Sequence, residues 1–321
     1  MTGNIKTLIY IASDERSGST LLDHIIGNHD DIICVGELMF FNDYLNQKGI
    51  GSTSKWVCRC GMTLECCPFW SNVIESCRLK ENHEISDLET IIYKRRNTTY
   101  KDAFLTLLIS YLPTKWKKPL LKKILKINEN KNAAYNCYKL LDHVCSVENK
   151  KIVIDSSKYP SQLSGLINYK RSDYNIKVIH LIRDGRSVAI SKIKRKKELF
   201  GENLTFTRAL LGWLLINLKI SNIKDLLPPQ DYILVRYEDL CVKTEQTIAE
   251  ICDHFDISYD SKILEFSEKK KHNIAGSQHK FDQSTRIQLD EKWKSSLSAS
   301  RNFLYSMICY ILANKVKAWK L

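Results

Sequence analysis

The feature that most constrains this chain is the segment at residues 7–28, which reads TLIYIASDERSGSTLLDHIIGN. It opens with an apolar run of strand type, continues through a polar turn that contains Gly18, and ends in apolar residues at the spacing of a helix with one buried face. We therefore expect a strand over residues 7–12 that is followed, after a tight turn, by a helix over residues 18–28.

In α/β proteins, a strand, a tight turn and a helix in this order present backbone N–H groups to a phosphate at the helix N-terminus. The hydroxyl groups of Ser17, Ser19 and Thr20 add hydrogen-bond donors, and Arg16 adds a guanidinium group suited to an oxyanion. The alternative is a serine-rich connection with a purely structural role.

The turn departs from the phosphate loop of nucleotide hydrolases, which reads GxxxxGK[ST]. When the two are aligned on Gly18 and Thr20, Ser13 takes the place of the first glycine and Ser19 takes the place of the lysine. Because that lysine reaches the γ-phosphate, its replacement disfavours hydrolysis of a nucleoside triphosphate. A P-loop-type kinase is kept as an alternative.

Strand-like segments recur along the chain and alternate with helical ones, at residues 32–35, 151–155, 177–182 and 232–236. This order indicates an α/β fold with a parallel sheet flanked by helices, which binds its ligand at the carboxyl ends of the strands. The candidates that we expect just past such ends are Arg16, Asp155, Arg183 and Tyr237.

The region between the second and third strands has a different composition. Residues 38–80 are rich in loops and cysteine, and residues 84–147 have helical spacing with a break at Pro113. We expect Pro119 to interrupt the basic stretch WKKPLLKKILK, which favours a helix that covers the active site over one on a membrane surface. The chain beyond the last strand is predicted to be helical apart from a loop at 272–285.

Four of the eleven cysteines cluster in CRCGMTLECCPFW, as Cys58, Cys60, Cys66 and Cys67. Zinc sites use paired cysteines about two residues apart, and CxC followed by CC matches this spacing imperfectly. The alternatives are a reduced or disulfide-closed structural loop and a structural metal site; a reducing compartment disfavours the disulfide.

The chain of 321 residues carries a net charge of +13. This charge is compatible with anionic ligands but does not identify one. Much of it lies in three clusters that we interpret as solvated faces, Lys115–Lys126, Lys192–Lys197 and Lys269–Lys271. A nucleic-acid binder is an alternative, but the chain shows no recognised binding motif, so we expect no nucleic-acid partner. Without a signal peptide or an apolar run long enough to span a bilayer, we expect a soluble cytoplasmic protein.

Four motifs together resemble the sulfotransferases that use 3′-phosphoadenosine 5′-phosphosulfate (PAPS), namely RSGSTLL at 16–22, DSSK at 155–158, VIHLIRDGRSVAIS at 178–191 and VRYEDL at 235–240. The chain is most similar to the carbohydrate and tyrosylprotein branch and its bacterial relatives. The resemblance implies a single P-loop-like sulfotransferase domain over residues 1–321, in which an inserted region at 38–150 covers the acceptor site.

The resemblance also implies which residues hold the nucleotide. The 5′-phosphosulfate is expected to bind at Arg16, Ser17, Gly18, Ser19, Thr20 and Leu21. Arg183 and Ser191 are expected to bind the 3′-phosphate, and Tyr237 is expected to lie against the nucleotide; the alternatives are an ion pair of Arg183 with Asp184 or Glu238 and core packing of Tyr237. The family often shows GN-x-x-R near the C-terminus, where this chain offers Ser277 and Lys280.

Sulfuryl transfer is an in-line displacement like phosphoryl transfer, and the resemblance to the tyrosylprotein branch makes Glu37 the expected base. Arg16 and Lys158 are the expected catalytic cations, so no catalytic metal is needed. His24 is the competing base, although we expect it to be structural. The acceptor is expected to be a hydroxyl or amine group of a small molecule, with a sugar or a tyrosyl group as further options.

Overall fold

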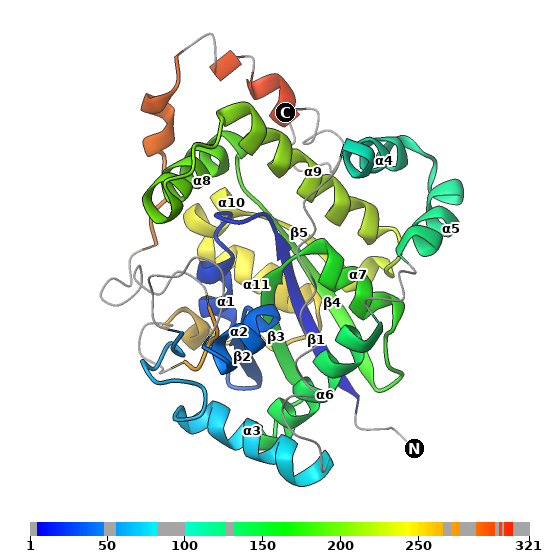
Figure 1. Cartoon of the computed structure of the whole chain (residues 1–321), viewed down its shortest axis with the longest axis vertical. Coiled ribbons are helices and arrows are strands. Elements are labelled where there is room, and N and C mark those ends of the chain that lie inside the picture. Colours follow the sequence, from blue (N-terminus) through cyan, green and yellow to red (C-terminus); the bar gives the residue numbers. More distant parts are fainter. Residues whose placement is uncertain are drawn as a thin grey trace.

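Within the described residues, five parallel strands form the centre of the protein in the spatial order β2–β3–β1–β4–β5 (Figure 1). The computed structural model describes residues 5–47, 56–81, 100–125, 131–265, 271–275, 287–298, 302–303 and 305–310. The strands are β1 (Lys6–Ser13), β2 (Ile32–Gly36), β3 (Ile152–Lys158), β4 (Tyr174–Ile182) and β5 (Tyr232–Arg236). The predicted α/β fold with a parallel sheet is confirmed.

The sheet is buried on both faces, as expected for a parallel sheet whose strands read as continuous apolar runs. In β1, Ile9 and Ile11 face a core shared with α1 (Ser19–Ile26), α10 (Tyr237–Val242) and α11 (Thr244–His254). Leu8 and Tyr10 face the opposite core, which is shared with α6 (Lys131–Glu148), α7 (Pro160–Asn168) and α9 (Phe206–Lys224). The helix α8 (Gly185–Phe200) packs on α9.

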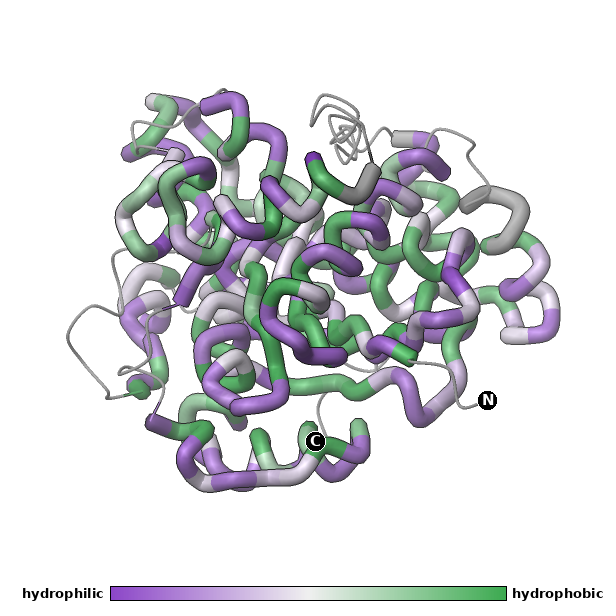
Figure 2. Tube along the Cα trace, turned by 90° about the horizontal axis from the view of Figure 1, so that it is seen from below, coloured by the Kyte–Doolittle hydropathy of each residue, from purple (hydrophilic) through white to green (hydrophobic). Residues whose placement is uncertain are grey.

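The helices cover both faces of the sheet because each element carries apolar side chains on the side that faces the core. The outer helices alternate between hydrophobic and hydrophilic stretches, as amphipathic helices do (Figure 2). Because successive residues of a strand point to opposite faces of the sheet, the apolar run of β1 contributes to both cores at once.

The inserted region contains more helix than the sequence predicted. The stretch predicted to be rich in loops, 38–80, holds a 3₁₀ turn (Leu38–Phe40), α2 (Phe41–Leu45) and the 14-residue α3 (Pro68–Glu81). The inward face of α3 has helical spacing that was available in the sequence, with Trp70, Val73, Ile74 and Cys77 all buried. The predicted helical stretch contains α4 (Tyr100–Tyr111), α5 (Thr114–Leu125) and α6, while its residues 84–99 and 126–130 lie outside the described residues.

The expectation that Pro119 interrupts the basic segment is wrong, because α5 continues through this proline. A proline inside a helix costs about 3 kcal/mol, because it removes one backbone hydrogen bond and its ring crowds the preceding turn. Burial of Leu121 on the same helix opposes that cost. Lys117 pairs with Asp225 at 2.7 Å, which places α5 beside the chain that enters β5. That the inserted region as a whole covers the acceptor site stays a prediction.

We predicted that the three lysine clusters are solvent-exposed faces. This prediction is wrong in part, because each cluster contains a lysine that is buried or mostly covered. Lys117 and Lys271 are buried, and Lys192 is mostly covered and paired with Asp14. Beyond β5, α10 and α11 are helical as expected, and so are residues 302–303 and 305–310. Short 3₁₀ turns at Ser261–Leu264 and Lys292–Ser296 stand where α-helix was expected. Among the described residues, we find no helix with the length and apolarity needed to cross a membrane.

Candidate active site

The turn between β1 and α1 has an unusual backbone. Arg16 and Gly18 both lie in the left-handed region, with φ of 70° and 93°. The Arg16 Nε donates to Ser191 Oγ of α8 at 2.9 Å, and Arg183 Nη1 donates to the Arg16 carbonyl oxygen at 3.1 Å. The fold thus brings Arg16 of the first motif into direct contact with Arg183 and Ser191, which both come from the motif at residues 178–191.

Gly18 has no room for a side chain. A Cβ atom built on Gly18 would lie 2.3 Å from the Tyr237 ring. The Arg183 guanidinium carbon lies 4.4 Å from the centre of the same ring, within the range of a cation–π contact. Burial raises the pKa of the Tyr237 hydroxyl, which therefore stays protonated. The Tyr237 ring consequently contacts both Gly18 in the turn and the Arg183 guanidinium group.

The turn holds polar groups that are suited to an anion. The buried Ser17 Oγ has no hydrogen-bond partner among the described residues, although a buried hydroxyl normally has one. Burial and the neighbouring Arg195 and Arg183 lower the pKa of Arg16, which marks a surplus of positive charge at this point. The first N–H groups of α1, from Ser19 onwards, add the positive end of the helix dipole.

The two acids in the turn are tied to other elements. Asp14 is completely buried, and its carboxylate lies 2.5 Å from Lys192 Nζ of α8. Burial raises the pKa of Asp14, and the attraction of Lys192 opposes this rise. Glu15 accepts a hydrogen bond from the Tyr159 hydroxyl at 2.8 Å. Our sequence reasoning missed these pairs, which connect both carboxylates to other elements.

Glu37 and Lys158 meet at the carboxyl ends of β2 and β3. Lys158 Nζ lies 2.5 Å from Glu37 Oε1, and both side chains are largely buried. Lys158 pairs with Ala12 of β1, one residue before β1 ends and the turn begins. The two predicted catalytic residues therefore form one ion pair at the same edge of the sheet as the turn.

The expectation that Asp155 lies past the end of a strand is wrong, because β3 runs on to Lys158. The strand continues because Lys158 still pairs with β1 after a shift in register. At this shift, Asp155 Oδ1 accepts hydrogen bonds from the backbone N–H and hydroxyl of Ser157 and from the Leu38 N–H. Burial raises the pKa of Asp155 to about 7. Asp155 therefore holds the backbone immediately after Glu37.

The histidines considered from the sequence have structural partners. His24 is buried in α1 against Arg59, and burial together with the charge of Arg59 lowers its pKa to about 3. His180 lies between the Tyr232 hydroxyl and Asn217 Oδ1 at 2.7 and 2.9 Å, and burial lowers its pKa to about 4. His29 contacts the Ser258 carbonyl oxygen at 2.8 Å.

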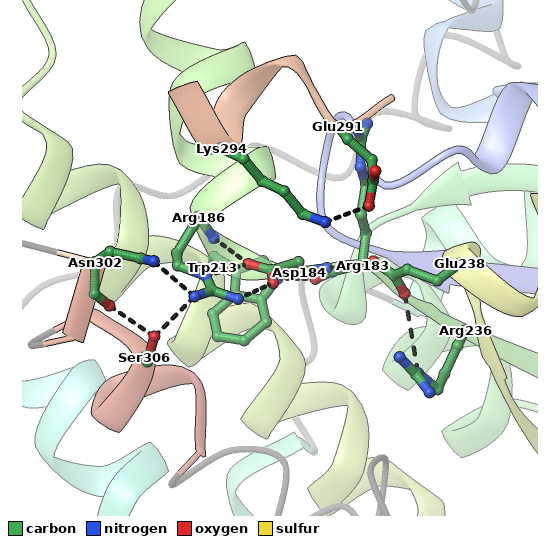
Figure 3. Close-up of polar contacts among 10 residues, drawn as sticks. All are labelled: Arg183, Asp184, Arg186, Trp213, Arg236, Glu238, Glu291, Lys294, Asn302 and Ser306. Carbon is green, nitrogen blue, oxygen red and sulfur yellow. Dashed lines mark hydrogen bonds and ion pairs between the residues drawn. The ribbon is translucent and has the colours of Figure 1, made fainter. Parts of the chain in front are cut away.

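Arg183 pairs with neither of the acids that the sequence offered as alternatives. Its Nη2 lies 3.3 Å from Asp290, which follows Leu289 in a segment far along the chain. Asp184 instead binds Arg186 at 2.5 Å, and Glu238 lies near Arg236 at 3.9 Å (Figure 3).

These residues line a cavity of about 410 Å³ beside Arg183. Most of the basic side chains that line this cavity lie close to an acidic side chain. Lys294, for example, points toward Glu291 at 2.5 Å (Figure 3). The C-terminal candidates Ser277 and Lys280 lie outside the described residues.

Comparison with known proteins identifies the family. Residues 9–261, well over half of the chain, match the sulfotransferase family. The chain belongs to this family. A Caenorhabditis briggsae protein named as a protein-tyrosine sulfotransferase is 24% identical over 274 residues, which are 84% of this chain and 72% of the relative.

Solved sulfotransferase structures share the fold of this sulfotransferase. The sulfotransferase domain of the olefin synthase from Synechococcus PCC 7002 aligns with a TM-score of 0.55 and 18% identity, over 99% of this chain and 96% of that one. Sulfotransferase STF1 from Mycobacterium tuberculosis H37Rv aligns with a TM-score of 0.50 and 12% identity, over 98% of this chain and 77% of that one. At these identities the likeness concerns the fold, and it agrees with the P-loop-like sheet.

The cysteine cluster of this sulfotransferase differs in one member from the predicted set. Cys58, Cys60 and Cys67 gather around His272, whereas Cys66 is exposed. Neighbouring residues at the start of a helix point in different directions, so Cys66 and Cys67 cannot both face inward. All eleven cysteines lie within the described residues, and none of them forms a disulfide there.

Proposed function

We propose that this sulfotransferase moves the sulfuryl group of PAPS to a hydroxyl group of a small-molecule acceptor, with Glu37 as the base. The observation that carries the proposal is the convergence of the turn at Arg16 with the Glu37–Lys158 ion pair at one edge of the sheet. A donor site and a base are needed side by side for in-line transfer, and this edge offers both.

The turn and α8 offer the two anion sites that PAPS requires. The phosphosulfate end would lie at the turn, where the Ser17 hydroxyl lacks a partner among the described residues and the N-terminus of α1 is positive. The 3′-phosphate would lie at Arg183 and Ser191, which are linked to the turn through Arg16. Tyr237, whose ring already contacts the Arg183 guanidinium group, would pack against the nucleotide.

PAPS supplies a sulfuryl group on a good leaving group, and the chain supplies position, charge and a proton acceptor. Glu37 would accept the proton of the acceptor hydroxyl while the new O–S bond forms and the bond from sulfur to the phosphate oxygen breaks. Lys158 and Arg16 would stabilise the negative charge that develops on the sulfuryl and leaving oxygens. Both cations are already held by the fold, by Glu37 and Ser191 respectively.

The kinase alternative is not favoured, because Ser19 occupies the position of the lysine that binds a γ-phosphate. The acceptor follows less directly from the site. A carboxylate base suits any alcohol or phenol, and the relative named as a protein-tyrosine sulfotransferase adds a tyrosyl hydroxyl to the compounds to be tested.

Nucleotide binding tests the donor site. The thermal midpoint should rise more with 3′-phosphoadenosine 5′-phosphate (PAP) than with ADP, which lacks the 3′-phosphate. Ser191→Ala should weaken PAP binding about tenfold or more, the loss expected for a hydrogen bond to a charged group, and should weaken ADP binding less, through the loss of the Arg16 contact alone. Lys194→Ala, a highly exposed change on the same helix, is the matched control. Equal stabilisation by PAP and ADP would contradict the proposal.

Turnover tests the base. Glu37→Gln keeps the shape of the side chain but cannot accept a proton, so turnover should fall by about 10² to 10⁴ while PAP affinity stays close to that of the wild type. His24→Asn is the comparison for the competing base. A near-normal rate for Glu37→Gln together with loss of activity in His24→Asn would make the histidine the base.

A further inference from the structure

Four side chains from distant parts of the chain meet beside β2. Cys58, Cys60 and Cys67 come from the inserted region, and His272 comes from a segment 205 residues beyond Cys67. Their ligand atoms all lie within 4.8 Å of one another. The Sγ atoms of Cys67 and Cys58 are 3.6 Å apart, and His272 Nδ1 lies 3.1 Å from Cys67 Sγ and 3.9 Å from Cys58 Sγ.

These distances suit a tetrahedral zinc site. Zinc binds thiolate sulfur at about 2.3 Å and imidazole nitrogen at about 2.0–2.1 Å, so its ligands lie about 3.8 Å apart for two sulfurs and about 3.5 Å apart for a sulfur and a nitrogen. The observed separations of 3.6, 3.1 and 3.9 Å lie around these values. Only small side-chain movements would complete the coordination.

We propose that Cys58, Cys60, Cys67 and His272 bind one structural zinc ion. Three thiolates and one imidazole form a closed set of four ligands, which is typical of structural zinc rather than catalytic zinc. Such a centre carries one net negative charge. Arg59 and Lys271, each adjacent in sequence to a ligand, both contact His24 of α1.

Groups around the ligands hold them in place. Gly61 follows the two cysteines of the CxC pair with φ of 89°, which favours glycine, and its N–H donates to the Cys58 carbonyl oxygen at 2.8 Å. The His272 ring stacks on Phe69 with centroids 5.8 Å apart, and Trp70 Nε1 donates to the His272 carbonyl oxygen at 2.6 Å. These contacts fix the position of the His272 ring and backbone beside the cysteines.

The proposed ion would fasten the edge of the sheet near Glu37. Next to His272, Ile274 forms a parallel bridge with Gly36, its N–H donates to the Val35 carbonyl oxygen at 3.0 Å, and its own carbonyl oxygen accepts from the Glu37 N–H at 2.8 Å. The ion would thus tie the inserted region to the segment that holds the Glu37 backbone. This proposal does not depend on the role of Glu37.

Metal analysis tests the site. Protein purified without chelator should contain about one zinc ion per chain by elemental analysis, and Co²⁺ in its place should show a thiolate charge-transfer band and intense tetrahedral d–d bands. Cys66→Ser should retain the metal, since Cys66 is exposed, whereas Cys58→Ser and His272→Gln should lose it. An equal loss of metal in Cys66→Ser and Cys58→Ser would overturn the assignment.

Removal of the metal from the wild-type protein provides a second test, which applies even if the ligand variants fail to fold. Chelation of the metal should lower the thermal midpoint and speed hydrogen exchange at the Glu37 and Ile274 amides, and zinc should restore both. Reduced wild-type protein that takes up neither zinc nor cobalt would refute the proposal, as would an isolated Cys58–Cys67 disulfide. Unchanged exchange at these amides in metal-free protein would refute the fastening role.

Discussion

Substitution of Gly18 by alanine would destabilise the turn in two ways, through backbone strain and through a steric clash with Tyr237. The backbone of Gly18 lies at φ of 93°, where an L-residue is strained by about 1–2 kcal/mol. The added Cβ would also lie 2.3 Å from the Tyr237 ring, and overpacking of this kind costs about 1–3 kcal/mol. Together we expect Gly18→Ala to lower the free energy of unfolding by about 2–5 kcal/mol.

Two other glycines serve as controls. Gly201 ends α8 at φ of 63°, and a Cβ there would meet no described atom within 4 Å, so Gly201→Ala should show the backbone strain alone, about 1–2 kcal/mol. Gly212 lies inside α9 with equal space and no positive φ, so Gly212→Ala should stabilise the protein by about 0.5–1 kcal/mol.

Urea unfolding and PAP titration would be measured on all three variants. Because Tyr237 also contacts Arg183, displacing its ring should weaken PAP binding in Gly18→Ala and in neither control. If Gly18→Ala were no less stable than Gly201→Ala and bound PAP normally, the close contact between Gly18 and Tyr237 would be refuted.

Three further predictions follow from buried polar groups. Ser17→Ala removes a hydroxyl that lacks a partner among the described residues, so thermal scans should show equal or higher stability while calorimetry shows PAP affinity about tenfold lower. Burial raises the pKa of Asp155 to about 7, above the ordinary value of 3.8, so the folded protein holds this proton more tightly than the unfolded chain. The free energy of unfolding should therefore fall between about pH 4 and 7, by at most about 1.4 kcal/mol per pH unit from this group, and Asp155→Asn should reduce the slope in urea titrations. Lys192→Met leaves Asp14 buried without its cation and should cost about 3 kcal/mol or more in urea unfolding, most of which Asp14→Asn should restore in the double variant.

The nucleotide-binding motifs were accessible from the sequence because their chemistry is local. An apolar run, a polar turn with Gly18 and one-sided helical spacing specify a strand, a turn and a helix within about twenty residues. Arg183 and Tyr237 follow their strands directly, and the carboxyl ends of parallel strands meet at one edge. The family resemblance supplied their expected roles, which remain to be tested.

The pairing of Glu37 with Lys158 needed the sheet as well as the motifs. The order β2–β3–β1 places the ends of two strands next to each other, and irregular register on both sides of β3 sets where each side chain points. The position of Asp155 also depends on how the strands pair. Its polar sequence indicates the end of a strand, yet β3 continues to Lys158, which pairs with β1 after a shift in register.

By itself, the sequence determined the α/β class, the strand–turn–helix at residues 7–28 and the cysteine-rich composition beside it, because these depend on periodicity and composition within short stretches. Only the tertiary structure decided that His272 joins the cysteines and that Cys66 does not. A contact across 205 residues arises where a parallel bridge between Gly36 and Ile274 brings two segments together. No local pattern encodes that bridge, because it depends on how distant segments are packed around the whole sheet.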